Sequence, residues 1–268
     1  MKPTDTSARD AAVQQNRRVW NETAAIHERV RMPALMNDIA RGNFSTLDAT
    51  EARIFASLGV ERGLAVAQLC CNNARELLSL ALRDAGRCTG FDLSDAFIDQ
   101  GRRLAAAAKA HLELVCTSVY DIPTRFDGLY DVVYVTVGAL GWMPDLAGFL
   151  AVAARLLAPG GSLFIYEMHP LLDMLDPDSG LTLKHSYFRH EPYVNEAEAD
   201  YYDPSTRVNE TSFWYHYTLA ELFTGCLRRG LAITHFEEHA HDVSTVFAHL
   251  AAEHMLPLSY TLIARKRA

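Results

Sequence analysis

A polar turn between two apolar segments carries the residues whose types and spacing best suit chemistry. Residues 66–80 read as a short strand, a turn over Cys70 to Asn73 and a helix, and the strand that follows ends in the carboxylate of Asp92. Such a turn lets the backbone approach a ligand closely, and an acid at the next strand end can accept both hydroxyl protons of a ribose. The glycines of a dinucleotide fingerprint are absent. The pattern therefore predicts a nucleoside cofactor in which the turn holds a group other than a pyrophosphate.

Two histidines are candidates for removing a proton from a substrate. His169 follows the predicted fifth strand, and His216 lies within Trp214–Tyr217, directly before a helix. An imidazole with a pKa near 6.5 suits proton removal at neutral pH. For His169 the alternative is a backbone hydrogen bond that orients the following loop. For His216 the alternative is a solvent-facing position on a strand.

The order of apolar segments predicts an α/β fold. Strands are expected near residues 65–70, 87–92, 112–116, 129–135 and 161–167, with helices between them near 74–84, 95–108 and 145–157. Strands that alternate with helices form parallel sheets covered on both faces. Two more helices are expected at 7–28 and 47–58, before the first strand.

The alternation stops after the fifth strand. Residues 170–217 are rich in proline, acidic and aromatic residues and show no clear period. Long segments of this kind are functional caps or disordered, and the aromatic content favours a cap, with a β-hairpin expected within Thr206–Tyr217. A helix capped by Thr218 and Glu221 then precedes two closing strands near 231–238 and 256–264.

These motifs resemble the class I S-adenosylmethionine-dependent methyltransferases. The first motif of that family, acid-x-Gly-x-Gly-x-Gly, falls on Gln68, Cys70, Asn72 and Ala74, and the sequence Leu-Leu-Ala-Pro-Gly-Gly at 156–161 matches a second family motif. The variant Leu-Cys-Cys-Asn-Asn at 69–73 is similar to a subgroup of bacterial small-molecule methyltransferases. Ala74 in place of glycine is strained only if its φ is positive.

The resemblance implies a Rossmann-like, seven-stranded methyltransferase sheet whose last two strands form an antiparallel pair at its edge. The whole chain, 1–268, is expected as one domain. Its parts would be an N-terminal helical lid (1–58), a cofactor-binding core (59–169), a substrate cap inserted after the fifth strand (170–217), and a C-terminal helix with an edge hairpin (218–268).

The resemblance also implies S-adenosyl-L-methionine as cofactor, with S-adenosyl-L-homocysteine as product. The residues expected to bind it are Gln68, Cys70, Cys71, Asn72, Asn73, Asp92, Leu93, Ser118, Val119 and Thr136. The residues expected to bind the substrate are Trp20, His27, Trp142, Tyr187, Tyr202 and Trp214.

Composition narrows the partners. A net charge of −8 without a basic stripe argues against nucleic acid, and no apolar run approaches the ~20 residues that span a bilayer. The polar N-terminus has no apolar signal segment, so a cytoplasmic protein is expected. The odd number of cysteines, 5, favours reduced thiols, and no metal site is expected because the histidines at 235, 239 and 241 have no clustered partner.

The sequence therefore predicts a methyltransferase that acts on an N or O atom of a small aromatic or heterocyclic metabolite, in bacterial secondary metabolism. A homodimer is left open. Two alternatives remain: an enzyme that uses the same cofactor for a non-methylating reaction such as a cyclisation, and a binding protein that has lost catalysis. A nicotinamide dehydrogenase is disfavoured because the phosphate-binding glycines are missing.

Overall fold

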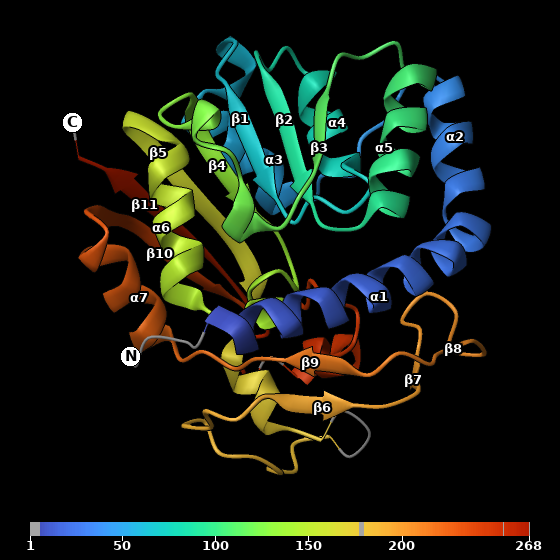
Figure 1. Ribbon diagram of the computed structural model, residues 1–268, viewed down its shortest axis with the longest axis vertical. Coiled ribbons are helices and arrows are strands. Elements are labelled where there is room, and N and C mark those ends of the chain that lie inside the picture. The colour runs from blue at the N-terminus through green and yellow to red at the C-terminus, as the bar shows by residue number, and fades with distance from the viewer. Residues whose placement is uncertain (1–5, 177–179, 254, 268) are drawn as a thin grey trace.

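The computed structural model describes residues 6–176, 180–253 and 255–267, and its centre is one seven-stranded sheet (Figure 1). The strand order is β10-β11-β5-β4-β1-β2-β3. The bounds are β1 (Val66–Leu69), β2 (Cys88–Asp92), β3 (Glu113–Cys116), β4 (Tyr130–Val135), β5 (Leu157–Met168), β10 (Leu231–His239) and β11 (Ser259–Lys266). Strands β1 to β5 pair in parallel, and β11 runs antiparallel to both of its neighbours. The predicted α/β, Rossmann-like seven-stranded sheet is confirmed.

Helices cover both faces of this sheet. The α-helices are α1 (Thr6–Val30), α2 (Met32–Ala40), α3 (Ala49–Leu58), α4 (Arg75–Ala81), α5 (Asp95–Ala107), α6 (Leu146–Leu156) and α7 (Leu219–Arg228). The short 3-10 helices are η1 (Val60–Arg62), η2 (Val119–Asp121), η3 (Thr124–Phe126), η4 (Leu140–Trp142), η5 (Pro170–Met174) and η6 (Ala248–Glu253). The sequence predicted every α-helix except α2.

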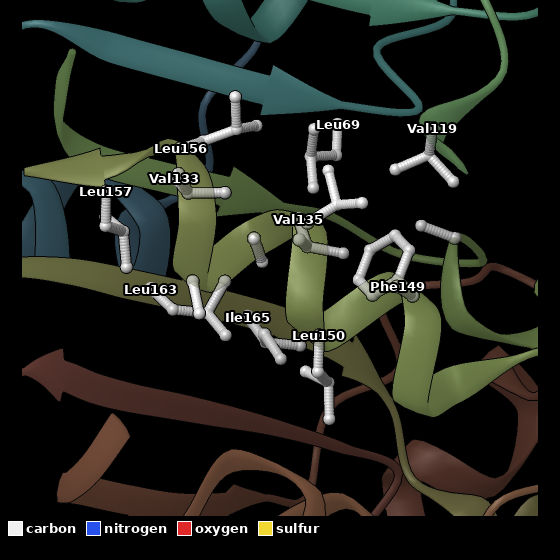
Figure 2. Close-up of a cluster of buried hydrophobic side chains, with 14 of the residues drawn as sticks. Leu69, Val119, Val133, Val135, Phe149, Leu150, Leu156, Leu157, Leu163 and Ile165 are labelled. Carbon is white, nitrogen blue, oxygen red and sulfur yellow. The ribbon is translucent and has the colours of Figure 1, made fainter. Parts of the chain in front are cut away.

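Side-chain alternation along the strands divides the core between the two faces. Val133 and Ile165 pack with Phe149 of α6 on one face, as Figure 2 shows. Tyr134 and Phe164 belong to the cluster on the opposite face, with side chains of α3, α4 and α5. A strand buried on both faces needs apolar side chains at nearly every position, which is why β4 and β5 read as continuous apolar runs. The same alternation decides which strand-end residues face which side of the sheet.

The segment after β5 forms two small sheets. Its strands are β6 (Tyr193–Asn195), β7 (Glu198–Ala199), β8 (Arg207–Val208) and β9 (Ser212–Trp214), and β6 pairs with β9 while β7 pairs with β8. The predicted hairpin within Thr206–Tyr217 is therefore wrong. The backbone N–H groups of Asn209 and Glu210, which would form its turn, both donate to the carboxylate of Glu22 in α1.

Helix α1 crosses the carboxyl ends of the strands and lies between the sheet and β9 (Figure 1). Its Asn16 side chain donates to the backbone carbonyl of Trp142, which follows β4, and the side-chain amide oxygen of its Asn21 accepts from the hydroxyl of Ser94, which follows β2. On its other side, Gln15 donates to the Thr211 carbonyl in the segment after β5. The helix thus joins the sheet to that segment.

The closing elements follow the sequence closely. Thr218 and Glu221 form the predicted capping box at the start of α7, and Gly230 has a φ of 74° directly after the helix. Strands β10 and β11 pair antiparallel, with β10 at the edge of the sheet. The predicted pair of closing strands is confirmed.

One buried acid in the core has a measurable consequence for stability. Glu51 of α3 is 5% exposed, accepts the Asp48 backbone N–H at 2.8 Å and contacts the Tyr134 hydroxyl. Burial, and then the charge of Glu76, raises the pKa of Glu51 to about 7. Between pH 4.5 and 7 the unfolded chain therefore releases a proton that the folded chain keeps, and stability falls as pH rises.

We expect Glu51→Gln to remove this loss. The free energy of unfolding of the variant, compared with that of the unchanged protein, should increase by on the order of 2 to 3 kcal/mol as the pH rises from 4.5 to 8, because the amide cannot ionise. Urea unfolding at several pH values measures the difference, with Glu61→Gln, an exposed change, as control. Parallel pH profiles for all three proteins would contradict the assignment.

Candidate functional site

The turn between β1 and α4 has an unusual backbone. Cys70, Asn72 and Ala74 have φ values of 53°, 51° and 55°, so every second residue is left-handed. Non-glycine residues adopt this region rarely, and Asn tolerates it best. These are the three positions that the resemblance aligned with glycines, and Ala74 is accordingly in the strained conformation.

Asp92 fixes this turn to the end of β2. Its carboxylate accepts the backbone N–H of Asn72 at 2.7 Å and that of Ser94 at 2.8 Å. The side chain is 8% exposed, and burial raises its pKa to about 6 although these hydrogen bonds oppose the shift. A carboxylate has about four lone-pair directions, so two remain for a ligand.

A cavity, here called cavity 1, opens beside Asp92. Five of the predicted cofactor residues line it, namely Cys70, Asp92, Leu93, Ser118 and Val119, and so do Trp20 and Trp142 of the predicted substrate set. It also contains Asn16, Phe91, Thr117 and Tyr120. The structure thus brings the strand-end residues of β2 and β3 together under α1.

The other predicted cofactor residues do not line cavity 1. Gln68 is fully buried and alternates along β1 with Ala67 and Leu69, so its side chain lies on the face of the sheet opposite to α6. Neither polar atom of its amide has a hydrogen-bond partner among the described residues. Asn73 lies within hydrogen-bonding distance of Gln100, at 3.5 Å, and Cys71 is buried beneath the turn. Asn72 contributes its backbone to Asp92, and Thr136 follows β4 with its carbonyl bonded to the Ala139 N–H.

Aromatic rings connect α1 to the carboxyl ends of the strands. The ring centroids of Trp20 in α1 and Trp142 are 4.9 Å apart, and those of Trp142 and Trp214 in β9 are 5.9 Å apart. His27 of α1 is buried among Phe97, Tyr201 and Tyr202, and its Nε2 is 3.3 Å from a carboxylate oxygen of Asp200. Burial lowers the pKa of His27 to about 4. His27 and Tyr202 therefore join α1 to the segment after β5 and line neither of the two cavities described here.

Both candidate bases have their nitrogens occupied. His169 accepts the Leu171 N–H at Nδ1, so Nε2 carries the proton and donates to Glu238 at 3.1 Å. Burial lowers the pKa of His169. This arrangement matches the alternative in which His169 orients the following loop, and a catalytic role stays a prediction.

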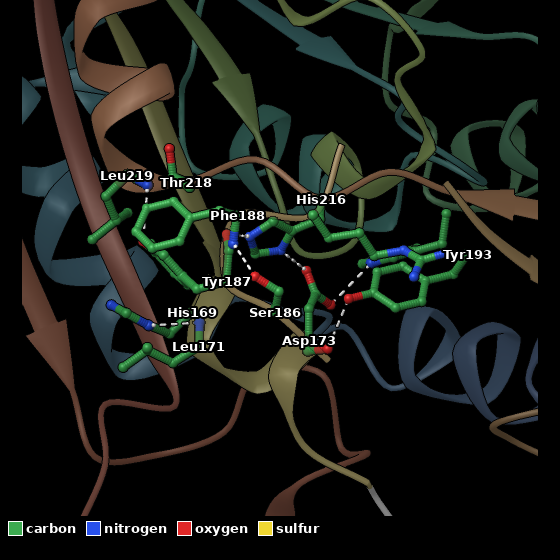
Figure 3. Close-up of polar contacts among 12 residues, drawn as sticks. His169, Leu171, Asp173, Ser186, Tyr187, Phe188, Tyr193, His216, Thr218 and Leu219 are labelled. Carbon is green, nitrogen blue, oxygen red and sulfur yellow. Dashed lines mark hydrogen bonds and ion pairs between the residues drawn. The ribbon is translucent and has the colours of Figure 1, made fainter. Parts of the chain in front are cut away.

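Figure 3 shows His216 between the Asp173 carboxylate and the Tyr187 carbonyl. Both neighbours are acceptors, each 2.8 Å away, so both ring nitrogens must donate and the imidazole is held protonated. Burial is the largest single effect and alone would lower the pKa of His216, but the hydrogen bond and charge of Asp173, the bond to the Tyr187 carbonyl and the charge of Glu221 together raise it. A protonated imidazole is a poor base, so a catalytic role for His216 stays a prediction that this geometry does not favour.

A second cavity, cavity 2, lies on the α6 and α7 side of the strand ends. Its wall includes Glu167, Asp173, Trp214, Tyr217 and Tyr260. Of the predicted substrate residues only Trp214 lines cavity 2. The carbonyl of Tyr187 accepts a hydrogen bond from His216, and its hydroxyl oxygen accepts one from the Leu219 N–H.

Glu167 is the site residue that the sequence analysis missed. It accepts the backbone N–H groups of Gly138, Leu140 and Met168 and is 5% exposed. Burial raises its pKa to about 7. Strand alternation could have indicated Glu167, because Leu163, Ile165 and Glu167 share a face of β5. The sequence analysis instead named the imidazole of His169, two residues later, as the candidate base.

No group of three or more His, Cys, Asp or Glu side chains in the described ranges is arranged to hold a metal ion. In the same part of the chain, no helix is both long enough and apolar enough to cross a membrane.

Comparison with known proteins agrees with this geometry. Residues 66–161 match the profile of the methyltransferase domain family. A demethylmenaquinone methyltransferase from Shouchella clausii is 30% identical over 114 residues, which are 41% of this chain and 47% of that protein. The chain thus matches about half the length of this curated relative.

Solved structures share the fold. A Listeria monocytogenes protein assigned to the S-adenosylmethionine-dependent methyltransferases has a TM-score of 0.61 at 17% identity, over 81% of this chain and 99% of that one. The [4+2]-cyclase SpnF has a TM-score of 0.52 at 15% identity, over 92% and 96%. These structures show that the fold is shared. The family match over residues 66–161 and the curated relative support the predicted class, a methyltransferase.

The left-handed turn leads to a prediction at Asn72. Asn72→Gly should change stability by less than about 1 kcal/mol, whereas Asn72→Val should lose about 1 to 2 kcal/mol more, because a β-branched residue fits this backbone poorly. Denaturant unfolding measures both. Asn37→Val, in the middle of α2, makes the same change in a helix and should cost less. Equal losses at the two asparagines would argue against strain in the turn.

Proposed function

We propose that this chain transfers a methyl group from S-adenosylmethionine to an N or O atom of a small molecule. The observation that carries the proposal is the pairing of Asp92 with a left-handed turn at the mouth of cavity 1. A turn without bulky side chains lets a ligand approach the backbone, and the free lone pairs of Asp92 suit two ribose hydroxyls.

The residues of cavity 1 fit the parts of this cofactor. Asp92 would accept the ribose hydroxyls, Ser118 and Val119 would flank the adenine, and the backbone of the turn after Cys70 would face the methionine part. When bound, S-adenosylmethionine supplies a methyl group on a sulfonium. Trp20 of α1 covers cavity 1 and would exclude water from that group.

The acceptor is proposed to be a small aromatic or heterocyclic metabolite. Trp142 and Trp214 support this assignment, because aromatic rings bind flat acceptors by stacking and apolar burial. Placement in the bacterial subgroup with the Leu-Cys-Cys-Asn-Asn motif, in secondary metabolism and in the cytoplasm, is part of the same proposal. It names no nucleic-acid or membrane partner, and pairing with a second copy stays a prediction.

A non-methylating reaction is the second candidate. The likeness to a [4+2]-cyclase over 92% of the chain favours it. Product mass distinguishes the two, because methylation adds one CH2 to the acceptor and converts the cofactor to S-adenosylhomocysteine. A binding protein without catalysis would give neither change.

Cofactor binding tests the proposal at Asp92. We expect calorimetric titration to show binding of S-adenosylmethionine and S-adenosylhomocysteine but not of NAD. Asp92→Asn should weaken binding about 10- to 100-fold, because charge-assisted hydrogen bonds are worth about 1.5 to 3 kcal/mol. Glu51→Gln, another buried acid that does not line cavity 1, is the control.

The pH dependence should follow the same carboxylate. Since binding requires ionised Asp92 and its pKa is about 6, affinity should fall as pH drops below 6. The Asp92→Asn variant should lack this dependence. Absence of binding, or unchanged affinity in a folded Asp92→Asn variant, would reject the assignment of cavity 1.

A further inference from the structure

We propose that cavity 2 binds the acceptor as a protonated amine and that Glu167 both anchors its ammonium group and takes its proton. This inference rests on the proposed function and narrows it from an N or O acceptor to an amine.

The charges around cavity 2 favour a cation. Its titratable wall residues are Glu167, Asp173 and three tyrosines, and no Lys, Arg or His lines it within the described residues. Asp173 is already paired, because it accepts the His216 Nδ1–H at 2.8 Å and the Trp214 indole N–H at 3.0 Å. The hydrogen bonds of Glu167 within the described part of the chain all come from backbone N–H groups. Its charge is therefore the one that a cationic ligand can neutralise.

Glu167 keeps a free position toward a ligand. Oε1 accepts the N–H groups of Gly138 and Met168, whereas Oε2 accepts only that of Leu140, at 3.1 Å. An oxygen with one bonded lone pair can accept from an ammonium group. Three backbone donors also fix the carboxylate in place, so little freedom is lost on binding.

The aromatic wall adds to cation recognition. Trp214, Tyr217 and Tyr260 line cavity 2, and the negative face of an aromatic ring attracts an ammonium ion by about 0.5 to 2 kcal/mol. A carboxylate next to such rings distinguishes an amine from a neutral alcohol and rejects an anion.

Cavity 2 is also placed for transfer from cavity 1. The ring centroids of Trp142, which lines cavity 1, and Trp214, which lines cavity 2, are 5.9 Å apart. The loop that Glu167 holds, Gly138 to Leu140, continues into Trp142 of cavity 1. An acceptor bound at Glu167 would thus sit next to the methyl donor.

The reaction step balances with this one base. The ammonium proton passes to Glu167, which becomes a neutral carboxylic acid. With S-adenosylmethionine bound as the methyl source, the freed nitrogen lone pair would form the N–C bond as the C–S bond breaks and sulfur keeps its electron pair. Glu167 then releases the proton to water. Groups that face Glu167 and influence its ionisation are Asp173 of η5, Tyr260 of β11 and Cys70.

Benzylamine, benzyl alcohol and benzoate test the charge preference, since they share a ring and differ in charge. We expect benzylamine to bind at least tenfold tighter than the other two at pH 8, with or without S-adenosylhomocysteine, measured by calorimetry. Equal or tighter binding of the alcohol or benzoate, or no binding of any probe, overturns the inference.

Glu167→Gln should reduce benzylamine affinity at least tenfold and abolish its rise between pH 6 and 8. Glu51→Gln is the matched control, because Glu51 is also buried with a pKa of about 7 but lines neither cavity. A purely structural Glu167 would leave the preference for the amine intact, and that result contradicts the proposal. Failure of the proposed function would instead appear as loss of S-adenosylhomocysteine binding in the unchanged protein.

A second variant keeps the location testable if Glu167→Gln does not fold. A Cβ at Gly141 would lie 2.3 Å from ring atoms of Trp214, so Gly141→Ala must displace that wall of cavity 2. We expect benzylamine binding to fall at least fivefold, with cofactor binding measured alongside. Unchanged benzylamine binding in Gly141→Ala would place the amine elsewhere.

Discussion

The hydrogen bond from the Asn72 backbone to Asp92 is the constraint on which the cofactor-binding region depends. It ties the turn after β1 to the end of β2, and the Ser94 N–H fixes the same carboxylate from the other side. The turn needs such a tie because its three left-handed residues include no glycine, and each would relax in a free peptide. The bond between Asn72 and Asp92 therefore holds the strained turn in place and also supplies a partner to the buried carboxylate.

Burial of acids recurs at the strand ends. Asp92 and Glu167 lie at the carboxyl ends of β2 and β5, which are separated in the sheet by β1 and β4. Each accepts backbone N–H groups, and burial raises the pKa of each. Carboxylates held in this way are poorly solvated and gain most from a cation that replaces water. A sulfonium donor and an ammonium acceptor are both cations, so one edge with two such acids suits a reaction between them.

The features that local sequence patterns determine could be predicted from the sequence, whereas those that depend on tertiary contacts could not. Strand and helix alternation, the capping box of Thr218 and Glu221, and the strand-end acid Asp92 all follow from short-range rules. The segment that leads into β9 is held by Glu22 of α1, nearly two hundred positions away, and β9 pairs with β6; no periodicity in the sequence indicates either contact. The two histidines were chosen by their pKa in water, whereas their neighbours occupy both nitrogens of each ring.

The position of α1 follows from buried contacts more than from its surface charges. The Arg18–Glu210 pair is exposed, and exposed pairs contribute little. Two of the contacts that fix α1 are the bond from Asn16 to the Trp142 carbonyl and the packing of Trp20 on Trp142. Both involve the loop that Glu167 holds through Gly138 and Leu140. We therefore expect a change in the Glu167 carboxylate to reach cavity 1 through that loop.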